Sequence, residues 1–286
     1  MNKIDYDMAA QDYRAVEALN KSSIDKILRC PLEYRLEGTV PDEPTPAMAF
    51  GTLVHGLLLE PDKLYETFHT MSQPATTKAG KAEKAQALAE GKTLVSQADF
   101  DKAMLMRSNA LSHPAAGWLL DLRSASEVSL FWDLPTEDGR IRRCKGRIDL
   151  LAFLPEDKGE ILVDLKTHSG SVAPEEIERT MYRFGYHRQA GWYMDGYERV
   201  TGHRPAGFYF IFLSTTAPYL VTACKISDQA ADIGYGECLK AERILHECEE
   251  SGKWPSYSDK LIEVDLPAWV YRKVADEMDV TDAVPF

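Results

Sequence analysis

Two aspartates and a lysine are the residues of this chain best suited to chemistry. Asp149 ends the string Gly146-Arg147-Ile148-Asp149, and Asp164 and Lys166 lie in Val163-Asp164-Leu165-Lys166-Thr167. Side chains alternate across a β-strand, so Asp164 and Lys166 share one face. If the two strands are neighbours, both carboxylates converge at one edge of the sheet with the lysine beside them. The string Asp164-Leu165-Lys166 alone is equally consistent with a solvent-facing pair at a strand end.

Carboxylate oxygens are the ligands that Mg²⁺ or Mn²⁺ prefer. Two neighbouring carboxylates also repel each other unless a cation neutralises them. An aspartate at the end of the otherwise apolar run Ile161–Leu165 is therefore hard to explain by solvation alone. The pattern predicts a divalent-cation site that could make a phosphodiester hydrolysable.

Two further residues could join this site. Glu127 is expected to begin the first strand of a three-strand meander, where it could offer a third carboxylate or simply be exposed. His55 lies four residues after Gly51 on a predicted helix, so both lie on one helix face. The glycine would let that helix approach the sheet closely. A lone histidine in an apolar helix is also typical of a hydrogen-bonded core residue, so only its neighbours favour a role in the site.

A stripe of tyrosines follows the lysine. The segment from Pro174 to about Tyr197 predicts one long helix, on which one face carries Tyr182, Tyr186, Gln189, Tyr193 and Tyr197. Such aromatic stripes usually pack in the core. Gln189 is the exception, because a buried amide needs partners, which a DNA phosphate or a metal-bound water could supply.

Composition and charge describe a globular protein. The hydrophobic content of 44% in 286 residues allows a substantial core. The chain has no apolar run long enough to span a membrane and no signal peptide, so a cytoplasmic location is expected. The net charge of −12 argues against DNA binding only superficially, because a site depends on local charge. Basic residues form two clusters near the predicted site and suggest a basic channel: Arg140, Arg142, Arg143, Lys145 and Arg147, and Arg179, Arg183, His187 and Arg188.

The five cysteines are expected to be free thiols. One early and three late cysteines also occur in nucleases that join their termini with an iron–sulfur cluster. In this chain the late cysteines are separated by 13 and 9 residues, which argues against a cluster.

The order of predicted elements defines the fold class. We expect a helix capped by Ser22 or Ser23 and ended by Cys30-Pro31, then a helix from about Ala47 to Leu59, and short helices between residues 76 and 118. A three-strand meander follows (Glu127–Leu134, Arg140–Phe153 and Ile161–Leu165), then the long helix, a hairpin (Phe208–Leu213 and Tyr219–Ile226) and a helix from Ser227 to Ser251.

This order predicts an α/β fold, a mixed central β-sheet flanked by helices, in a single domain over residues 1–286. Residues 1–120 would be mainly helical and carry His55. Residues 121–226 would form the sheet core with the carboxylates, and residues 227–286 a C-terminal helix and tail.

Four short motifs then match a family pattern in order. Gly51-Thr52-Leu53-Val54-His55 resembles G-x-x-x-H, and Gly146-Arg147-Ile148-Asp149 resembles G-x-x-D. Asp164-Leu165-Lys166 resembles (D/E)-x-K, and Gln189-Ala190-Gly191-Trp192-Tyr193 resembles Q-x-x-x-Y. Each motif is weak alone, but the ordered set resembles the RecB-type branch of the PD-(D/E)XK nuclease superfamily, with its restriction-endonuclease-like core. The strings at Arg29–Tyr34, Phe50–Pro61, Trp254-Pro255 and Leu266–Trp269 are similar to the phage-borne exonuclease VIII (RecE) type, a 5′→3′ double-strand exonuclease.

The resemblance implies roles for individual residues. Asp149 and Asp164 would be ligands of Mg²⁺, or Mn²⁺, with His55 as a further ligand or water-orienting group and Glu127 as an outer carboxylate. Lys166 would polarise the attacking water or steady the pentavalent phosphate. Gln189 and Tyr193 would position DNA or the lysine. Five basic residues are expected to contact DNA: Arg147, Arg29, Arg35, Arg183 and Arg188.

The resemblance also implies partners. It describes an exonuclease of the bacterial cytoplasm that resects linear double-stranded DNA ends in phage or prophage recombination by single-strand annealing. Such enzymes form homo-oligomeric rings and act beside a single-strand annealing protein. Two alternatives stay open: an endonuclease, such as a repair or CRISPR-associated nuclease, on the same core, and a catalytically silent DNA-binding scaffold. The joint presence of Asp149, Asp164 and Lys166 argues against the scaffold.

Overall fold

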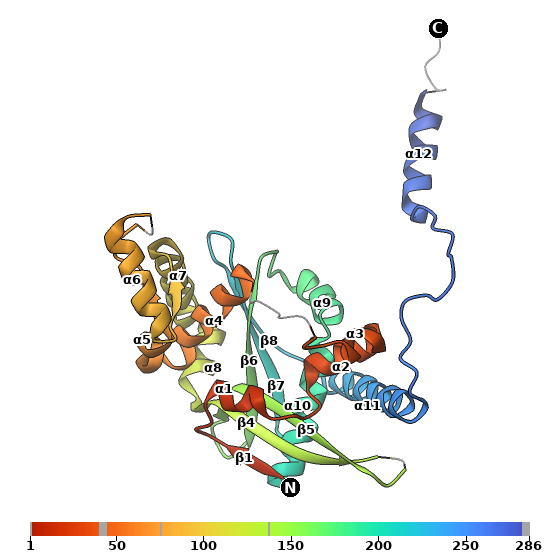
Figure 1. Cartoon of the computed structure of the whole chain (residues 1–286), viewed down its shortest axis with the longest axis horizontal. Helices are drawn as coiled ribbons and strands as arrows, with labels where there is room; N and C mark the ends of the chain where they lie inside the picture. Colours follow the sequence, from red (N-terminus) through yellow and green to blue (C-terminus); the bar gives the residue numbers. More distant parts are fainter. Residues whose placement is uncertain (1, 40–44, 75, 137, 282–286) are drawn as a thin grey trace.

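The computed structural model describes residues 2–39, 45–74, 76–136 and 138–281, with side chains to residue 277. A six-stranded sheet in the order β1-β4-β5-β6-β7-β8 forms its centre (Figure 1). Neighbouring strands are antiparallel except β6 and β7, which are parallel. This is the mixed α/β fold expected from the sequence. The strands are β1 (Lys3–Asp5), β4 (Arg123–Pro135), β5 (Ile141–Phe153), β6 (Glu160–His168), β7 (Gly207–Ser214) and β8 (Val221–Lys225).

Helices cover both faces of the sheet. One face packs against α2 (Lys21–Arg29), α10 (Tyr186–Thr201) and α11 (Asp228–Ser251), and the other against α4 (Pro46–Leu59), α7 (Gln97–Ser112) and α8 (Pro114–Asp121). Strand β6 therefore has two buried faces, with Leu162 in the first core and Val163 and Leu165 in the second. A strand covered on both sides is apolar throughout, which explains its uninterrupted apolar run. Asp164 is the exception, and only 2% of it is exposed.

The remaining described elements lie between or outside these layers. They are α1 (Ala10–Ala15), α3 (Pro31–Arg35), η1 (Pro61–Lys63), α5 (Leu64–Thr67), β2 (Phe68–Thr70), α6 (Lys78–Ala89), β3 (Thr93–Val95), α9 (Pro174–Arg183) and α12 (Ala268–Thr281). Strands β2 and β3 pair in parallel as a separate small sheet that the expectation of short helices missed. Strands of three residues are too short to show a period of two in the sequence.

Several expected boundaries are confirmed and two are wrong. Ser227 caps α11 by accepting a hydrogen bond from Ala230 N at 3.2 Å, as expected. Helix α2, however, is capped by Asn20, whose side-chain oxygen accepts from Ser23 N at 3.0 Å. The serines expected to cap it lie in its first turn instead. Glu127, expected at a strand start, lies in the interior of β4, because this strand begins four residues earlier, at Arg123.

The predicted long helix after Lys166 is two helices. Gly185 adopts a left-handed φ of +64° between α9 and α10, and a Cβ there would lie 2.1 Å from the Arg188 guanidinium. The chain therefore turns at this glycine. Tyr182 falls on α9 and is 74% exposed, so it is not part of the stripe that continues along α10.

The C-terminal residues leave the body of the molecule. After α11 the chain runs outward and ends in α12, which stands apart from the sheet and its helices (Figure 1). Within the described ranges, no helix combines the length and the apolar composition needed to cross a bilayer. The five cysteines are free thiols, as expected, and no described group of possible metal ligands includes one.

Candidate active site

The two aspartates lie where two strands of the sheet separate. β5 and β6 pair from Phe153 and Glu160 only as far as Leu150 and Val163. Asp149 and Asp164 are the next residues on their strands, so both acids sit at the point of divergence. Asp149 Oδ2 accepts a hydrogen bond from Leu165 N at 2.8 Å and so satisfies a backbone donor that the ladder leaves free.

His55 and Glu127 lie close to Asp149. Possible ligand atoms of the three residues all lie within 4.8 Å of one another. His55 Nδ1 is 3.4 Å from Asp149 Oδ2. Helix α4 comes this close because Gly51 faces β6: a Cβ at Gly51 would lie 3.2 Å from Thr167 Oγ1. The glycine of the G-x-x-x-H motif thus sets the position of the histidine.

Glu127 is held in a strained conformation. Its φ of +55° places it in the left-handed region, although it lies within β4. Arg147 Nε donates to Glu127 Oε2 at 2.6 Å. Arg147 Nη1 donates to Met8 O, in the segment before α1, at 3.1 Å and to Ser129 Oγ of β4 at 3.0 Å, and these bonds fix the guanidinium. The arginine predicted to contact DNA is therefore engaged in holding this carboxylate.

Lys166 and Gln189 both contact Asp164. Lys166 Nζ lies 2.5 Å from Asp164 Oδ1, and Gln189 Nε2 donates to Asp164 Oδ2. The partner of the buried amide is therefore a carboxylate of the site itself, where the sequence suggested a DNA phosphate or a bound water. Lys166 Nζ also lies 4.7 Å from the centre of the Tyr186 ring, a cation–π contact. Asp164, which the sequence predicted as a ligand of the cation, thus contacts Lys166 and Gln189 and is not part of the described group of possible ligands. Asp149 belongs to the group with His55 and Glu127.

Burial and crowding of charge control protonation in the site. Burial lowers the pKa of His55 to about 4, so its imidazole is neutral at pH 7 and free to bind a metal. Burial, reinforced by Asp164 and Glu127, raises the pKa of Asp149 well above its usual value. Burial also raises the pKa of Glu127, against the effect of Arg147. Burial alone would lower the pKa of Lys166, but the negative charge of Asp164 and Asp149 outweighs it and raises this pKa.

These shifts test whether a metal fits. The raised pKa values of Asp149 and Glu127 mean that their negative charge is destabilised as the residues stand. A divalent cation would remove that destabilisation, and one imidazole with two carboxylates is a usual donor set for one. His55, Glu127 and Asp149 therefore fit a divalent cation.

Two other tyrosines of the stripe, Tyr193 and Tyr197, pack in the interior of the protein. A Cβ at Gly146 would lie 2.9 Å from Tyr193 Cδ1, so the glycine of the G-x-x-D motif makes room for this ring. Burial raises the pKa of Tyr193 well above its usual value, so its hydroxyl stays protonated. Tyr197 is 2% exposed and belongs to the core. Tyr186, which sequence reasoning treated as packing, is the one that reaches the lysine. Its spacing of three residues from Gln189 was the available signal.

The remaining arginines predicted to contact DNA already have protein partners. Arg188 pairs with Asp25 at 2.8 Å and with Glu237 at 2.7 Å. Arg29 pairs with Glu33. Two others contact aromatic rings at 5.5 Å from the ring centre: Arg35 on Trp254 and Arg183 on Phe184.

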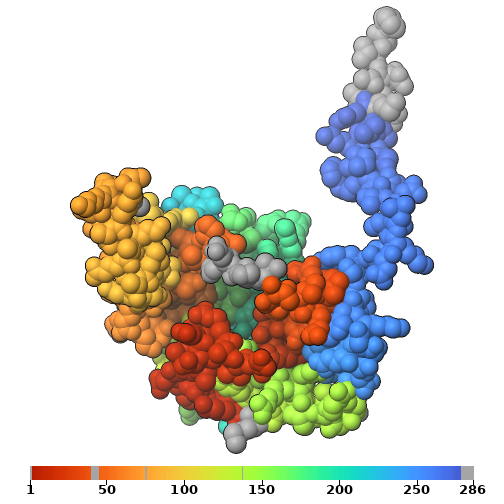
Figure 2. All heavy atoms as spheres, in the orientation of Figure 1, coloured from red at the N-terminus to blue at the C-terminus, as the bar shows by residue number. Residues whose placement is uncertain are grey.

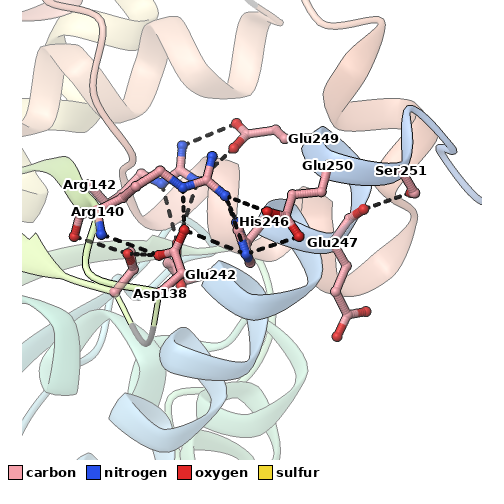
Figure 3. A network of polar contacts seen from close by, with 10 residues as sticks. Asp138, Arg140, Arg142, Glu242, His246, Glu247, Glu249, Glu250 and Ser251 are labelled. Carbon is pink, nitrogen blue, oxygen red and sulfur yellow. Dashed lines mark hydrogen bonds and ion pairs between the residues drawn. The ribbon is translucent and has the colours of Figure 1, made fainter.

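Most of the basic cluster at the start of β5 is paired within the protein (Figure 3). Arg140 contacts Asp138, His246 and Glu250, the last at 3.1 Å. Arg142 reaches two other glutamates of α11, Glu242 and Glu249. Lys145 is buried and donates to Val16 O at 2.6 Å and to Tyr13 O at 3.0 Å. The expectation that this cluster lines a basic channel is therefore wrong for Arg140, Arg142 and Lys145, because acids and carbonyls distant in sequence take up these cations.

Comparison with known proteins places the fold. Residues 21–265 match the family described as a PDDEXK-like domain of unknown function (DUF3799). Among solved structures, a "Putative exonuclease" from Eubacterium rectale superposes with a TM-score of 0.63 at 14% sequence identity, over 97% of this chain and 99% of that one. No curated protein sequence matches the chain. At this identity the superposition supports the fold alone.

Proposed function

This chain belongs to the family of PDDEXK-like domains (DUF3799) and has the fold of a hydrolytic nuclease, and on that premise we propose that it is a Mg²⁺-dependent exodeoxyribonuclease. The observation that supports this most is the meeting of Asp149, Asp164 and Lys166 where β5 and β6 separate. This arrangement places proposed metal ligands and a charged amine together where two central strands of the sheet diverge.

His55, Glu127 and Asp149 would hold the cation, for which Mn²⁺ could substitute. When bound, a divalent cation lowers the pKa of a water and stabilises negative charge on phosphate oxygens. Arg147 keeps Glu127 turned toward this group. The neutral imidazole of His55 needs no deprotonation before it binds.

Besides the metal ion, the proposed site has a positive charge from the protein, the ammonium of Lys166. Its raised pKa keeps it protonated at neutral pH. Asp164 and the Tyr186 ring fix its ammonium, so the lysine would donate a hydrogen bond to the attacking water or to the phosphate in a preset direction. Gln189 in turn fixes Asp164 through its second oxygen.

The finer proposal is resection of linear double-stranded DNA with 5′→3′ polarity during phage or prophage recombination, by a ring of identical subunits acting with a single-strand annealing protein. The order of the four motifs supports it, together with the likeness in fold to a "Putative exonuclease" over nearly the whole of both chains. An endonuclease on the same core is the second candidate, since the site itself does not require a DNA end.

One assay tests polarity, metal dependence and end requirement together. Linear duplex labelled separately at each end is digested with Mg²⁺, with Mn²⁺ and with a chelator, beside covalently closed circular duplex. We expect loss of the 5′ label first, no digestion with chelator and no cutting of closed circles. Rapid cutting of closed circles would favour the endonuclease. Undiminished digestion by Asp164→Asn would refute the site.

A further inference from the structure

The C-terminal arm, residues 252–281, exposes many large apolar side chains. After the end of α11 it projects away from the rest of the molecule (Figure 2), and its last described part is α12. Eight large apolar residues along it are each at least 48% exposed: Tyr257, Leu261, Ile262, Val264, Leu266, Trp269, Tyr271 and Val274. So much apolar surface on one segment marks it as an interaction site.

Part of the arm has the sequence pattern of a half-buried strand. In Ile262-Glu263-Val264-Asp265-Leu266, apolar and acidic residues alternate strictly. A period of two is typical of a strand with one face covered and the other in water. The segment belongs to no strand of this chain, and Val264 is 82% exposed. The pattern therefore indicates a strand whose partner lies outside this copy.

The sheet has an open edge of the matching kind. Within the described part of the chain, β8 pairs with β7 only. Ile226 N donates to Phe208 O at 3.1 Å, so by alternation Val221, Ala223 and Lys225 direct their N–H and C=O groups away from β7. An edge with free backbone groups is a template for another strand.

An apolar groove runs beside that edge. Its cavity of about 580 Å³ lies between β8, α9 and the start of α11. Apolar side chains line most of it: Ile177, Met181, Cys224, Ile226, Ala230 and Ile233. A strand added to β8 could place Ile262, Val264 and Leu266 in this groove. Its acidic residues would then lie on the other face of the sheet.

The arm of the same copy cannot reach this edge. The chain is pinned beside the far end of α11, because Leu32 N donates to Pro255 O at 3.1 Å and Tyr257 hydrogen-bonds Glu33. Helix α11 starts three residues after β8 and has 24 residues, which makes it about 36 Å long. Seven residues from Tyr257 to Val264 span at most about 25 Å. The occupant must come from another molecule.

We propose that residues 262–266 of one copy add as a strand to the β8 edge of a second copy. The arm and the edge are different surfaces, so the contact is heterologous and repeats until it closes into a ring or a reciprocal pair. This deepens the oligomeric part of the proposed function and does not depend on its chemistry. Asp164→Asn, which removes cleavage, should leave the association intact.

Sedimentation velocity and light scattering of the full chain at micromolar concentration provide the first test. We expect a multimer for the full chain and for the control Leu105→Asp, which adds the same charge at a 54% exposed position on α7. We expect a monomer for Val264→Asp and for a chain ending at Ser258. A monomeric full chain, or a multimer that survives removal of the arm, would overturn the proposal.

Cross-linking locates the contact. Cys224 lines the groove and provides one thiol for cross-linking. The variants Ile262→Cys, Val264→Cys and Leu266→Cys are each treated with a short bismaleimide, which reacts with one thiol at each of its two ends. At least one variant should give a covalent dimer that disappears when Cys224→Ser is added. If no variant gives a dimer, or the dimer persists without Cys224, the arm does not bind at β8.

Discussion

Among the residues that the structure describes, two groups bring one histidine together with two carboxylates, and the two differ in how well they suit a metal. His55, Glu127 and Asp149 lie at the divergence of β5 and β6, whereas Asp138, His246 and Glu250 lie where the β4–β5 hairpin meets α11. In the second group Arg140 already contacts all three residues (Figure 3).

The pKa values of the carboxylates in the two groups are shifted in opposite directions. A hydrogen bond from Thr136 and the charge of Arg140 hold the pKa of Asp138 below its usual range. Burial and neighbouring acids raise the pKa of Asp149. The charge of the second group is satisfied by the protein, while that of the first calls for a cation. Residue types alone therefore do not identify a metal site. The two groups differ because Arg140 contacts every member of the second group, whereas Arg147 contacts only Glu127 in the first.

The largest expected difference is in cleavage. Asp149→Asn should lower the rate of Mg²⁺-dependent digestion of linear duplex by about 10³-fold or more, because it removes a proposed metal ligand at the centre of the site. Asp138→Asn makes the same chemical change in the second group and should leave the rate within about twofold. Equal losses in both variants would show that the two groups do not differ in function. Circular dichroism checks that each variant is folded.

Removing the positively charged side chain near each group gives the next contrast. Lys166→Ala should slow cleavage by about 10²–10³-fold, since in the proposed mechanism its ammonium would act on the attacking water or the phosphate. Arg140→Ala should slow it little, because this arginine only joins the hairpin to α11. The measurement is the single-turnover rate at saturating Mg²⁺. A rate for Lys166→Ala close to that of the native chain would remove the lysine from the mechanism.

Metal binding should stabilise the fold through the first group alone. Mg²⁺ or Mn²⁺ at 100 times its Kd adds about 2.7 kcal/mol to the free energy of unfolding, seen as a rise in Tm. The rise should disappear in His55→Ala and persist in His246→Ala. Persistence in His55→Ala with loss in His246→Ala would assign the cation to the hairpin.

A variant of Arg147 tests whether anchoring of the Glu127 carboxylate matters for metal binding. Arg147→Ala should raise the metal concentration needed for half-maximal cleavage by about 10–100-fold, because the carboxylate loses its anchor. Arg142→Ala, an arginine of the same strand that pairs with Glu242 and Glu249, is the matched control and should leave that concentration unchanged. An equal shift in both variants would reduce Arg147 to a contributor to stability.

The smallest effect concerns pH and the second group. The pKa of Asp138 is lowered in the folded state, so its stabilising contribution is present above its unfolded value near 3.8 and is lost as pH falls below it. The difference in urea midpoint between the native chain and Asp138→Asn should therefore be greater at pH 7 than at pH 3. A difference that stays constant across this range would mean that Asp138 contributes nothing through its charge.

Much of the site could be predicted because its signals are local. The order of helices and strands, the glycines four and three residues before His55 and Asp149, and the alternation around Asp164 all follow from short-range geometry. The partner of Gln189 could not be predicted, because it depends on how α10 packs against β6. The neutralisation of Arg140 and Arg142 by α11 likewise depends on contacts about 100 residues apart in the chain.

By itself, the sequence determined the α/β architecture, the pair of strands that carry the acids, and the chemical types available to a nuclease site. These follow from periodicity and side-chain chemistry, which act over a few residues. The tertiary structure decided how the charges combine: Asp149 with His55 and Glu127, Asp164 with Lys166, and the β5 arginines with α11. Those choices depend on burial and on distances between elements remote in sequence, because Coulomb interactions and desolvation are set by position in space.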